Sequence, residues 1–221
     1  MSHWPLYDLR LTTDRLVLRL PDSALLEEMV ELVGQGIHPE GEMPFGVPWT
    51  DRPSPQREWE SVQHVLRSIA DWTPNSWAYV AVALRDGRVV GSQDLRGVEF
   101  ASCRTVSTGS WLGRAHQGKG LGLEMREAVL ELAFNHLGAL EAQSSAFHDN
   151  FASLGVSRRL GYEPNGSWLA PRRGRPDRME GLRLSRERWE RHRRHRVLVT
   201  GVEGCLDLFG VGALGADQPP V

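Results

Sequence analysis

A glycine-rich stretch, GRAHQGKGLG at residues 113–122, joins an expected strand to the most regular helical pattern in the chain. Apolar residues recur at helical spacing from Leu121 to His136, and Gly138 stands where a helix C-cap belongs. The first N–H groups of a helix have no partner within it, and the helix dipole adds positive potential there. A glycine-rich turn before such a helix is therefore typical of an anion-binding loop.

Three phosphate-binding patterns compete for this stretch. A P-loop needs a hydroxyl residue after its lysine to bind magnesium, but Gly120 follows Lys119. The dinucleotide fingerprint needs G-x-G-x-x-G, whereas Gly118, Gly120 and Gly122 alternate with single residues. The third pattern, Gln/Arg-x-x-Gly-x-Gly/Ala, is met by Gln117, Gly120 and Gly122. It indicates a pyrophosphate loop, with a simple tight turn as the alternative.

The rest of the chain reads as alternating strands and helices. Helices are expected from 22 to 33, from 54 or 55 to 73, and from 151 to 160. Strands are expected over 15–20, 77–84, 88–100, 105–113, 140–147, 162–169 and 179–184. The second helix is expected to carry one apolar face, made of Trp59, Val62, Val65, Leu66 and Ile69. No repeat or long linker divides the chain, so we expect one mixed α/β unit.

The segment between the first two helices, residues 37–55, is rich in proline and loop-like. It nevertheless carries Phe45 and Trp49, which a solvated loop seldom exposes. These aromatic side chains either pack onto the core or form a lid over a ligand.

Composition excludes several classes of protein. The net charge of -2 provides no basic field for nucleic acid or membrane. The arginine-rich stretch 172–196 is interrupted by acidic residues and is expected to be a solvated face. The two cysteines, Cys103 and Cys205, form no metal-type pair, and neither a signal peptide nor a long apolar run is evident. We therefore expect a cytoplasmic protein without metal, nucleic-acid or membrane partners.

Four features together resemble the GNAT acyltransferase superfamily, in particular its ribosomal-protein N-acetyltransferase (RimJ/RimL-like) branch. They are TTDRLVLRLP, GSWLGRAHQGKGLGLEM, HDNFASLGVSRRLGY and the order of elements, which together cover residues 9–184. The resemblance implies the GNAT fold, an α/β (α+β) arrangement with a mixed, splayed central sheet flanked by helices. The GNAT domain is expected over 1–184, and 185–221 as a C-terminal extension that joins the same domain or forms an oligomer contact.

The resemblance also implies a site for an acyl-coenzyme A donor. The strand end at Trp111, Leu112 and Gly113 offers backbone groups to the pantetheine arm. Asn150 matches an asparagine that hydrogen-bonds the pantetheine, and Ser153 a serine near the sulfur. The pyrophosphate is expected on the loop residues Gln117, Gly118, Lys119, Gly120, Leu121 and Gly122.

The implied reaction is acyl transfer from acyl-CoA to a primary amine by direct attack. The amine requires a proton acceptor and the departing thiolate a hydrogen-bond donor. Ser153 is the expected donor, with helix capping as its alternative role. The base is unassigned among Asp94, Glu99, His148 and Asp149.

Three questions stay open at this stage. Acetyl-CoA is the expected donor, with succinyl-CoA as the alternative if a cation lies near the pocket. A non-catalytic acyl-CoA-binding module is a further alternative to an enzyme. We also expect a homo-oligomer, because the C-terminal extension carries the apolar residues Leu198, Val199, Leu206, Leu208 and Phe209.

Overall fold

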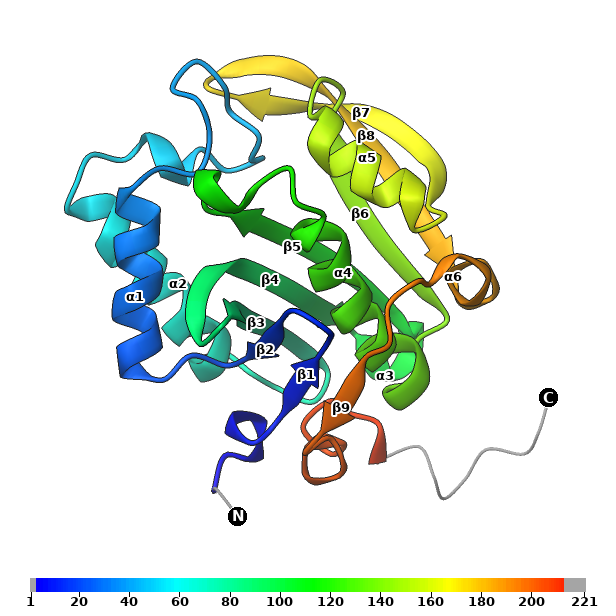
Figure 1. Ribbon diagram of the computed structural model, residues 1–221. Helices are drawn as coiled ribbons and strands as arrows, with labels where there is room; N and C mark the ends of the chain where they lie inside the picture. Colours follow the sequence, from blue (N-terminus) through cyan, green and yellow to red (C-terminus); the bar gives the residue numbers. More distant parts are fainter. Residues whose placement is uncertain (1–2, 213–221) are drawn as a thin grey trace.

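The computed structural model describes residues 3–212 and contains one nine-stranded sheet (Figure 1). Its strands follow the order β7-β8-β6-β5-β4-β3-β2-β1-β9. The strands are β1 (Arg10–Thr12), β2 (Val17–Arg19), β3 (Ser76–Arg85), β4 (Arg88–Val98), β5 (Thr105–Leu112), β6 (Glu141–Phe147), β7 (Glu163–Arg172), β8 (Arg175–Ser185) and β9 (Leu198–Thr200). The β5–β6 neighbours are parallel and the other described neighbours antiparallel. The expected fold class, a mixed sheet flanked by helices, is confirmed.

Helices cover both faces of this sheet. They are α1 (Ser23–Gly34), α2 (Gln56–Ala70), α3 (Phe100–Cys103), α4 (Leu121–Glu131), α5 (Phe151–Arg159) and α6 (Arg186–His192). Short 3-10 turns lie at η1 (Pro5–Tyr7), η2 (Trp49–Asp51), η3 (Arg114–His116) and η5 (Glu203–Cys205). In Figure 1, α1 and α2 lie together on one side of the sheet and α4 on the other.

The alternation of β3 explains the two helical layers. Successive side chains of a strand point to opposite faces, so Tyr79 and Ala81 share one face and Val80 and Val82 the other. Val80 and Val82 pack in the cluster that contains the apolar residues of α1. Tyr79 and Ala81 belong to the larger cluster under α4. Both faces of this strand are therefore buried.

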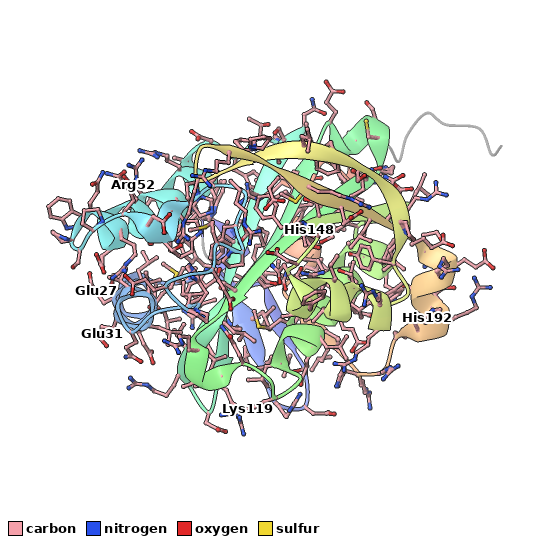
Figure 2. All side chains as sticks on the ribbon, turned by 90° about the horizontal axis from the view of Figure 1, so that it is seen from above. Glu27, Glu31, Arg52, Lys119, His148 and His192 are labelled. Carbon is pink, nitrogen blue, oxygen red and sulfur yellow. The ribbon has the colours of Figure 1, made fainter. Side chains whose placement is uncertain are left out.

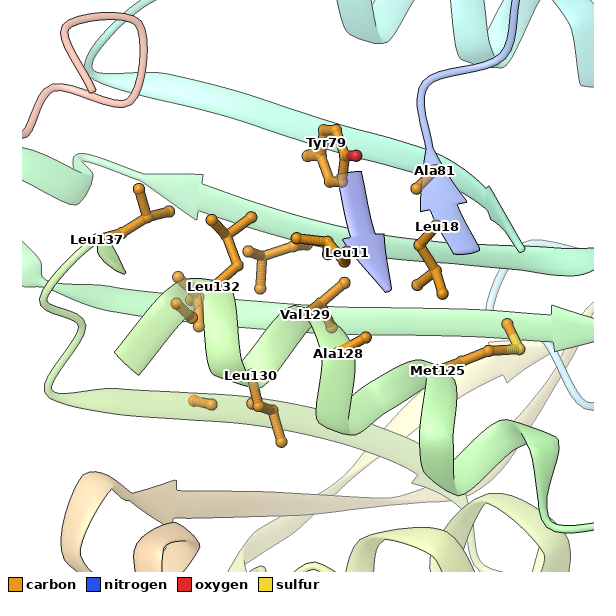
Figure 3. Packing of buried hydrophobic residues seen from close by; sticks show 14 of the residues in the cluster. Leu11, Leu18, Tyr79, Ala81, Met125, Ala128, Val129, Leu130, Leu132 and Leu137 are labelled. Carbon is orange, nitrogen blue, oxygen red and sulfur yellow. The ribbon is translucent and has the colours of Figure 1, made fainter. Parts of the chain in front are cut away.

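Helix α4 is the centre of the larger cluster. Met125, Ala128 and Val129 face the sheet beside Leu11 and Leu18 of the first hairpin (Figure 3). The helix continues into a π-helical turn, η4 (Leu132–His136), instead of the single α-helix expected to His136.

Three charged side chains of α4 are also buried, and each contacts a different part of the chain. Glu124 binds the β1–β2 hairpin, Glu127 binds the segment before β9, and Arg126 contacts β6 and α5. The helix thereby connects both ends of the chain to the middle of the sheet.

The sheet splays between β5 and β6. The two strands pair only at their beginnings, from Thr105 with Glu141 to Ser107 with Gln143. Beyond that point β5 stays paired with β4 up to Leu112, while β6 pairs with β8. The edge of β5 after Ser107 therefore has no neighbouring strand on the β6 side, as the resemblance implied.

Two local features go beyond what the sequence predicts. The strand expected over 15–20 is present as β2, but it is one half of a hairpin with β1. In the turn between them the Thr13 N–H donates to the Leu16 carbonyl and the Leu16 N–H to the Thr13 hydroxyl oxygen. The apolar face expected for α2 is only partly covered: Trp59 is 63% exposed and Leu66 50% exposed, while Val65 is buried. Helical periodicity marks an apolar stripe but not whether the sheet is wide enough to cover it.

The C-terminal extension, as far as residue 212, packs on the rest of the chain. Strand β9 pairs with β1 and covers that edge of the sheet (Figure 1). Phe209 is fully buried, with its ring 4.8 Å from that of Trp77 and 5.2 Å from that of Trp72. Much of the apolar surface behind the expected homo-oligomer is thus used within the chain. The oligomer stays a prediction.

We expect Glu127→Leu to detach the segment before β9. Glu127 is 1% exposed and accepts hydrogen bonds from the backbone N–H groups of Arg194 and His195 and from the His195 ring. Losing these bonds should lower the free energy of unfolding by about 2 kcal/mol. Hydrogen exchange of residues 193–200 should accelerate more than that of β4. Uniform acceleration across the sheet would contradict a local anchoring role.

Candidate functional site

The glycine-rich loop brings an uncapped helix N-terminus to the surface. Gly118 and Gly120 have φ angles of +72° and +79°, which side-chain-bearing residues rarely adopt. Gly120 is the N-cap of α4 and offers no side chain to the first-turn N–H groups. In α1 and α5 the side chains of Asp22 and Asn150 fill that role. The unsatisfied donors and dipole of α4 therefore suit an anion, as expected for a pyrophosphate.

The side chains of Gln117 and Lys119 form hydrogen bonds that hold the loop in place. Gln117 donates from Nε2 to the carbonyl oxygens of Ile37 and Leu112, at 2.6 and 2.8 Å. It thus joins the loop to β5 and to the segment after α1. Lys119 extends outward from the molecule and donates to the Ala115 carbonyl at 2.7 Å (Figure 2). An anion placed here would meet backbone N–H groups first, with Lys119 as the adjacent cation.

A buried carboxylate supports the loop from beneath, a contact that the sequence interpretation missed. Glu124 is fully buried and accepts hydrogen bonds from the Thr13 hydroxyl, the Arg15 N–H and the Arg15 guanidinium. Arg15 also donates to the Lys119 carbonyl at 3.0 Å. Burial alone raises the pKa of Glu124, but the hydrogen bonds from Thr13 and Arg15 outweigh it and leave that pKa below its ordinary value. The loop is therefore tied to the β1–β2 hairpin.

The residues at the end of β5 lie close to the loop. A Cβ on Gly113 would come within 2.5 Å of the Leu32 side chain, so α1 packs directly on this backbone. Leu121 is fully buried and has only backbone groups to offer a ligand. A Cβ on Gly122 would reach ordinary contact with Leu112 and Val156, which places the start of α4 beside α5.

Asn150 and Ser153 stand at the N-terminus of α5. The Asn150 side chain accepts from the Ser153 N–H at 3.1 Å and donates to the Pro44 carbonyl at 3.4 Å. Asn150, not Ser153, therefore caps the helix, and the Ser153 hydroxyl makes no hydrogen bond within residues 3–212. The Ser153 side chain is half-buried. Helix capping, the alternative role for Ser153, is therefore performed by Asn150.

The long loop after α1 spans the open end of the splay. The ring of Trp49 lies 5.2 Å from Phe45 and 6.2 Å from Trp111 of β5. Arg173, in the β7–β8 turn, forms a salt bridge with Asp51 at 2.7 Å. The loop thus connects the α1 side of the molecule with the β7–β8 hairpin, and its two aromatic side chains are half-buried.

A pocket of about 330 Å³ lies where β5 and β6 separate. Its lining residues come from five strands: Asp94, Arg96, Ser107, Thr108, Gly109, Gln143, Ser144, Ser145, Asn165, Trp168, Gly181 and Leu182. A larger hollow of about 400 Å³ follows the β1–β2 hairpin and includes no residue of β5, β6 or α5. The smaller pocket is the one that belongs to the splay.

Of the four base candidates, Asp94 lines this pocket. Its carboxylate lies 2.6 Å from the Arg96 guanidinium and 3.9 Å from the His64 ring. Asp149 is paired with Arg172 at 2.8 Å and His148 lies 3.4 Å from Asp177. Glu99 lies at the N-cap of α3, beyond the end of β4. The structure therefore brings Asp94 to the splay, whereas Asp149 is paired with Arg172 and His148 with Asp177.

The remaining features of residues 3–212 concern metal ligands, membrane spans and cysteines. No group of three or more His, Cys, Asp or Glu side chains in this range is arranged to hold a metal ion. No described helix is long and apolar enough to cross a membrane. Burial raises the pKa of the Cys205 thiol to about 11, and Cys103 is exposed at the end of α3. Both cysteines are free thiols.

Comparison with solved structures finds the same architecture in several acetyltransferases. RimL, the ribosomal L7/L12 α-N-protein acetyltransferase in complex with coenzyme A, is 17% identical, with a TM-score of 0.64 over 78% of this chain and 94% of its own. RimJ from Mycobacterium smegmatis, in complex with a CoA disulfide, is 17% identical, with a TM-score of 0.64 over 84% and 91%. The microcin C7 self-immunity acetyltransferase MccE, in complex with acetyl-CoA and AMP, is 17% identical, with a TM-score of 0.61 over 78% and 93%. At this identity these likenesses concern the fold.

The family itself is identified from the sequence profile. The model of the acetyltransferase (GNAT) domain matches residues 15–163, which include the hairpin contact to the loop, the loop, the splayed strands and α5. This range is about two thirds of the chain. The protein belongs to the GNAT family of N-acyltransferases.

Proposed function

We propose that this enzyme transfers an acyl group from acyl-CoA to a primary amine by direct attack. One observation carries the proposal: the uncapped N-terminus of α4 opens at the same end of β5 as the unpaired strand edge. A pyrophosphate-bearing ligand on the loop would thus have an extended backbone beside it, ready to accept hydrogen bonds as a strand does.

The donor residues follow from this placement. Backbone N–H groups at Gly118, Gly120 and Gly122 would hold the pyrophosphate, with Lys119 as a nearby cation. The backbone at Trp111 and Leu112 would pair with the pantetheine arm, and Asn150 would bond it in place of Pro44. Bound acyl-CoA supplies an activated thioester. The chain's own groups position it and stabilise the charge that develops during transfer.

The acceptor would approach from the Asp94 side of the pocket at the splay. Asp94 is the acidic residue of its lining, and its charge favours the approach of an alkylammonium group. Arg96 holds the carboxylate in place at 2.6 Å, so we assign Asp94 to positioning the amine. A water molecule in contact with Asp94 or His64 would then complete proton removal.

Acetyl and succinyl groups are the two donors considered. Acetyl needs no additional partner, whereas the succinyl carboxylate needs a cation beside the acyl chain. A non-catalytic binding module would bind either CoA ester without turnover. Release of free thiol from acetyl-CoA and succinyl-CoA over a panel of primary amines separates these functions, and binding without any release would contradict the enzymatic proposal.

We expect Ser153→Ala to lower turnover by about tenfold to a hundredfold while the affinity for CoA changes little. The hydroxyl is free to donate to a departing thiolate, because Asn150 already caps α5. Steady-state kinetics and calorimetric CoA binding measure the two effects. Ser153→Thr is the matched variant, since it keeps a hydroxyl and should retain most of the turnover. Equal turnover in Ser153→Ala and the wild type would make the residue structural.

A further inference from the structure

A cluster of polar side chains is buried beside the splay, and we name it the Arg126 cluster. It contains Arg126 of α4, Thr108 of β5, Ser144 of β6, Ser157 of α5 and Tyr162 after α5. Arg126 donates from Nη1 to the hydroxyls of Ser157 at 2.8 Å and Ser144 at 3.4 Å. Arg126 is 3% exposed and Tyr162 5% exposed. The cluster thus joins the two strands that separate to the two helices beside them.

The cluster has more donors than acceptors. Among residues 3–212 no carboxylate forms an ion pair with Arg126, and its Nε makes no hydrogen bond. The buried hydroxyls of Thr108 and Tyr162 also make no hydrogen bond of ordinary geometry in that range. The other buried charges of α4 differ, since Glu124 pairs with Arg15 and Glu127 with His195. A buried cation without a counter-charge is costly, and such groups are usually paired.

The protonation states of Tyr162 and Arg126 leave both side chains as hydrogen-bond donors. Burial raises the pKa of the Tyr162 phenol, and the nearby Arg126 charge and Thr108 hydroxyl only partly oppose that rise. Tyr162 therefore keeps its proton at neutral pH. Burial lowers the pKa of Arg126, but a guanidinium remains charged in proteins. A cation with two hydroxyl groups is the complement of a carboxylate.

The cluster also borders a cavity. Thr108 and Ser144 line the pocket of about 330 Å³ at the divergence of β5 and β6. Ser144 both lines this pocket and accepts a hydrogen bond from Arg126. An elongated anionic group that enters the pocket would therefore meet Ser144 and Thr108 first and the guanidinium next.

The last step rests on the function proposed above and concerns the direction in which the acyl-CoA donor would lie along β5. A pantetheine arm that starts at the loop and follows β5 runs from Leu112 toward Ser107, where the strands converge. An acyl chain longer than acetyl would extend toward that closed end. We propose that the Arg126 cluster binds the terminal carboxylate of a short dicarboxylic acyl group, such as succinyl, and so selects this class of acyl-CoA.

The test compares succinyl-CoA with acetyl-CoA in the same protein preparations. The wild type is expected to show a kcat/KM for succinyl-CoA at least tenfold above that for acetyl-CoA, with one primary amine as acceptor. Arg126→Met should lower this ratio by roughly thirtyfold or more, because it removes the charged partner of a buried carboxylate. Tyr162→Phe removes only one hydroxyl and should lower the ratio by about tenfold. The ratio cancels any general loss of folded enzyme.

Controls separate the possible failures. Arg159→Met, at the exposed end of α5, should leave the ratio unchanged. If CoA itself stabilises the wild type in a thermal-shift assay but both esters react equally, the proposed function stands and the carboxylate site is wrong. If no CoA ester binds, the proposed function itself is wrong, whatever the role of the Arg126 cluster.

A second source of a carboxylate is the acceptor. If the cluster binds that carboxylate instead, the wild type acts on amino acids but not on their amides with either donor, and Arg126→Met loses this preference. That pattern would assign the cluster to the acceptor and overturn its assignment to the acyl group, as would an unchanged donor ratio in both Arg126→Met and Tyr162→Phe.

Discussion

Gly120→Val is expected to raise the Kd for acyl-CoA by roughly a hundredfold, which corresponds to about two charge-assisted hydrogen bonds. Gly120 is the N-cap of α4 with φ +79°, and a branched side chain there both shields the first-turn N–H groups and disfavours the turn that exposes them. Calorimetric titration with CoA measures the effect without relying on turnover. The backbone strain should also lower the free energy of unfolding by about 1–2 kcal/mol.

Gly87→Val is the matched control for that strain. Gly87 lies in the β3–β4 turn with φ +78°, and no atom lies within 4 Å of a Cβ built on it. The two substitutions should therefore destabilise the protein to a similar extent, while Gly87→Val leaves CoA binding at the wild-type level. Similar losses of binding in both variants would show that general destabilisation, not the loop, accounts for the effect.

The sequence predicts the local shape of the glycine-rich loop better than it predicts the pocket at the splay. Loop chemistry is local: glycine spacing, the preceding strand and the apolar period of α4 lie within one stretch of chain. Gln117 was correctly placed in the loop, but its side chain reaches Ile37, a contact that no local pattern indicates. The pocket at the splay depends on residues from five strands, and their proximity is set by sheet order rather than by spacing.

The buried charges of α4 were missed for a related reason. Glu124, Arg126 and Glu127 occupy neighbouring positions in a helix, and a charge run is usually a solvated face. Their burial follows from packing around α4 on every side, by the first hairpin, by α5 with β6, and by the C-terminal segment. Local signals, such as the Asp22 cap of α1, can by contrast be read from residue order alone.

Glu124→Gln is expected to lower the free energy of unfolding by about 2 kcal/mol at neutral pH, because it weakens the buried hydrogen bonds from Thr13 and Arg15. Arg15 is 39% exposed and can turn to water, which keeps the loss below that of a fully buried pair. Urea unfolding measures the change. Glu31→Gln, an exposed position on α1 (Figure 2), is the control and should have little effect.

The same pair of proteins gives a test in acid. Since the folded-state pKa of Glu124 lies below its ordinary value of 4.5, its stabilisation is present above pH 4.5 and is lost as the pH falls through the folded pKa. The wild type should therefore lose more stability than Glu124→Gln over that range, and the difference between them should shrink. Other carboxylates with lowered pKa values, such as Asp22 and Asp177, are shared by both proteins and cancel in the difference. A difference that stays constant with pH would mean that Glu124 acts through shape and not through charge, and the loop would then owe its position to packing.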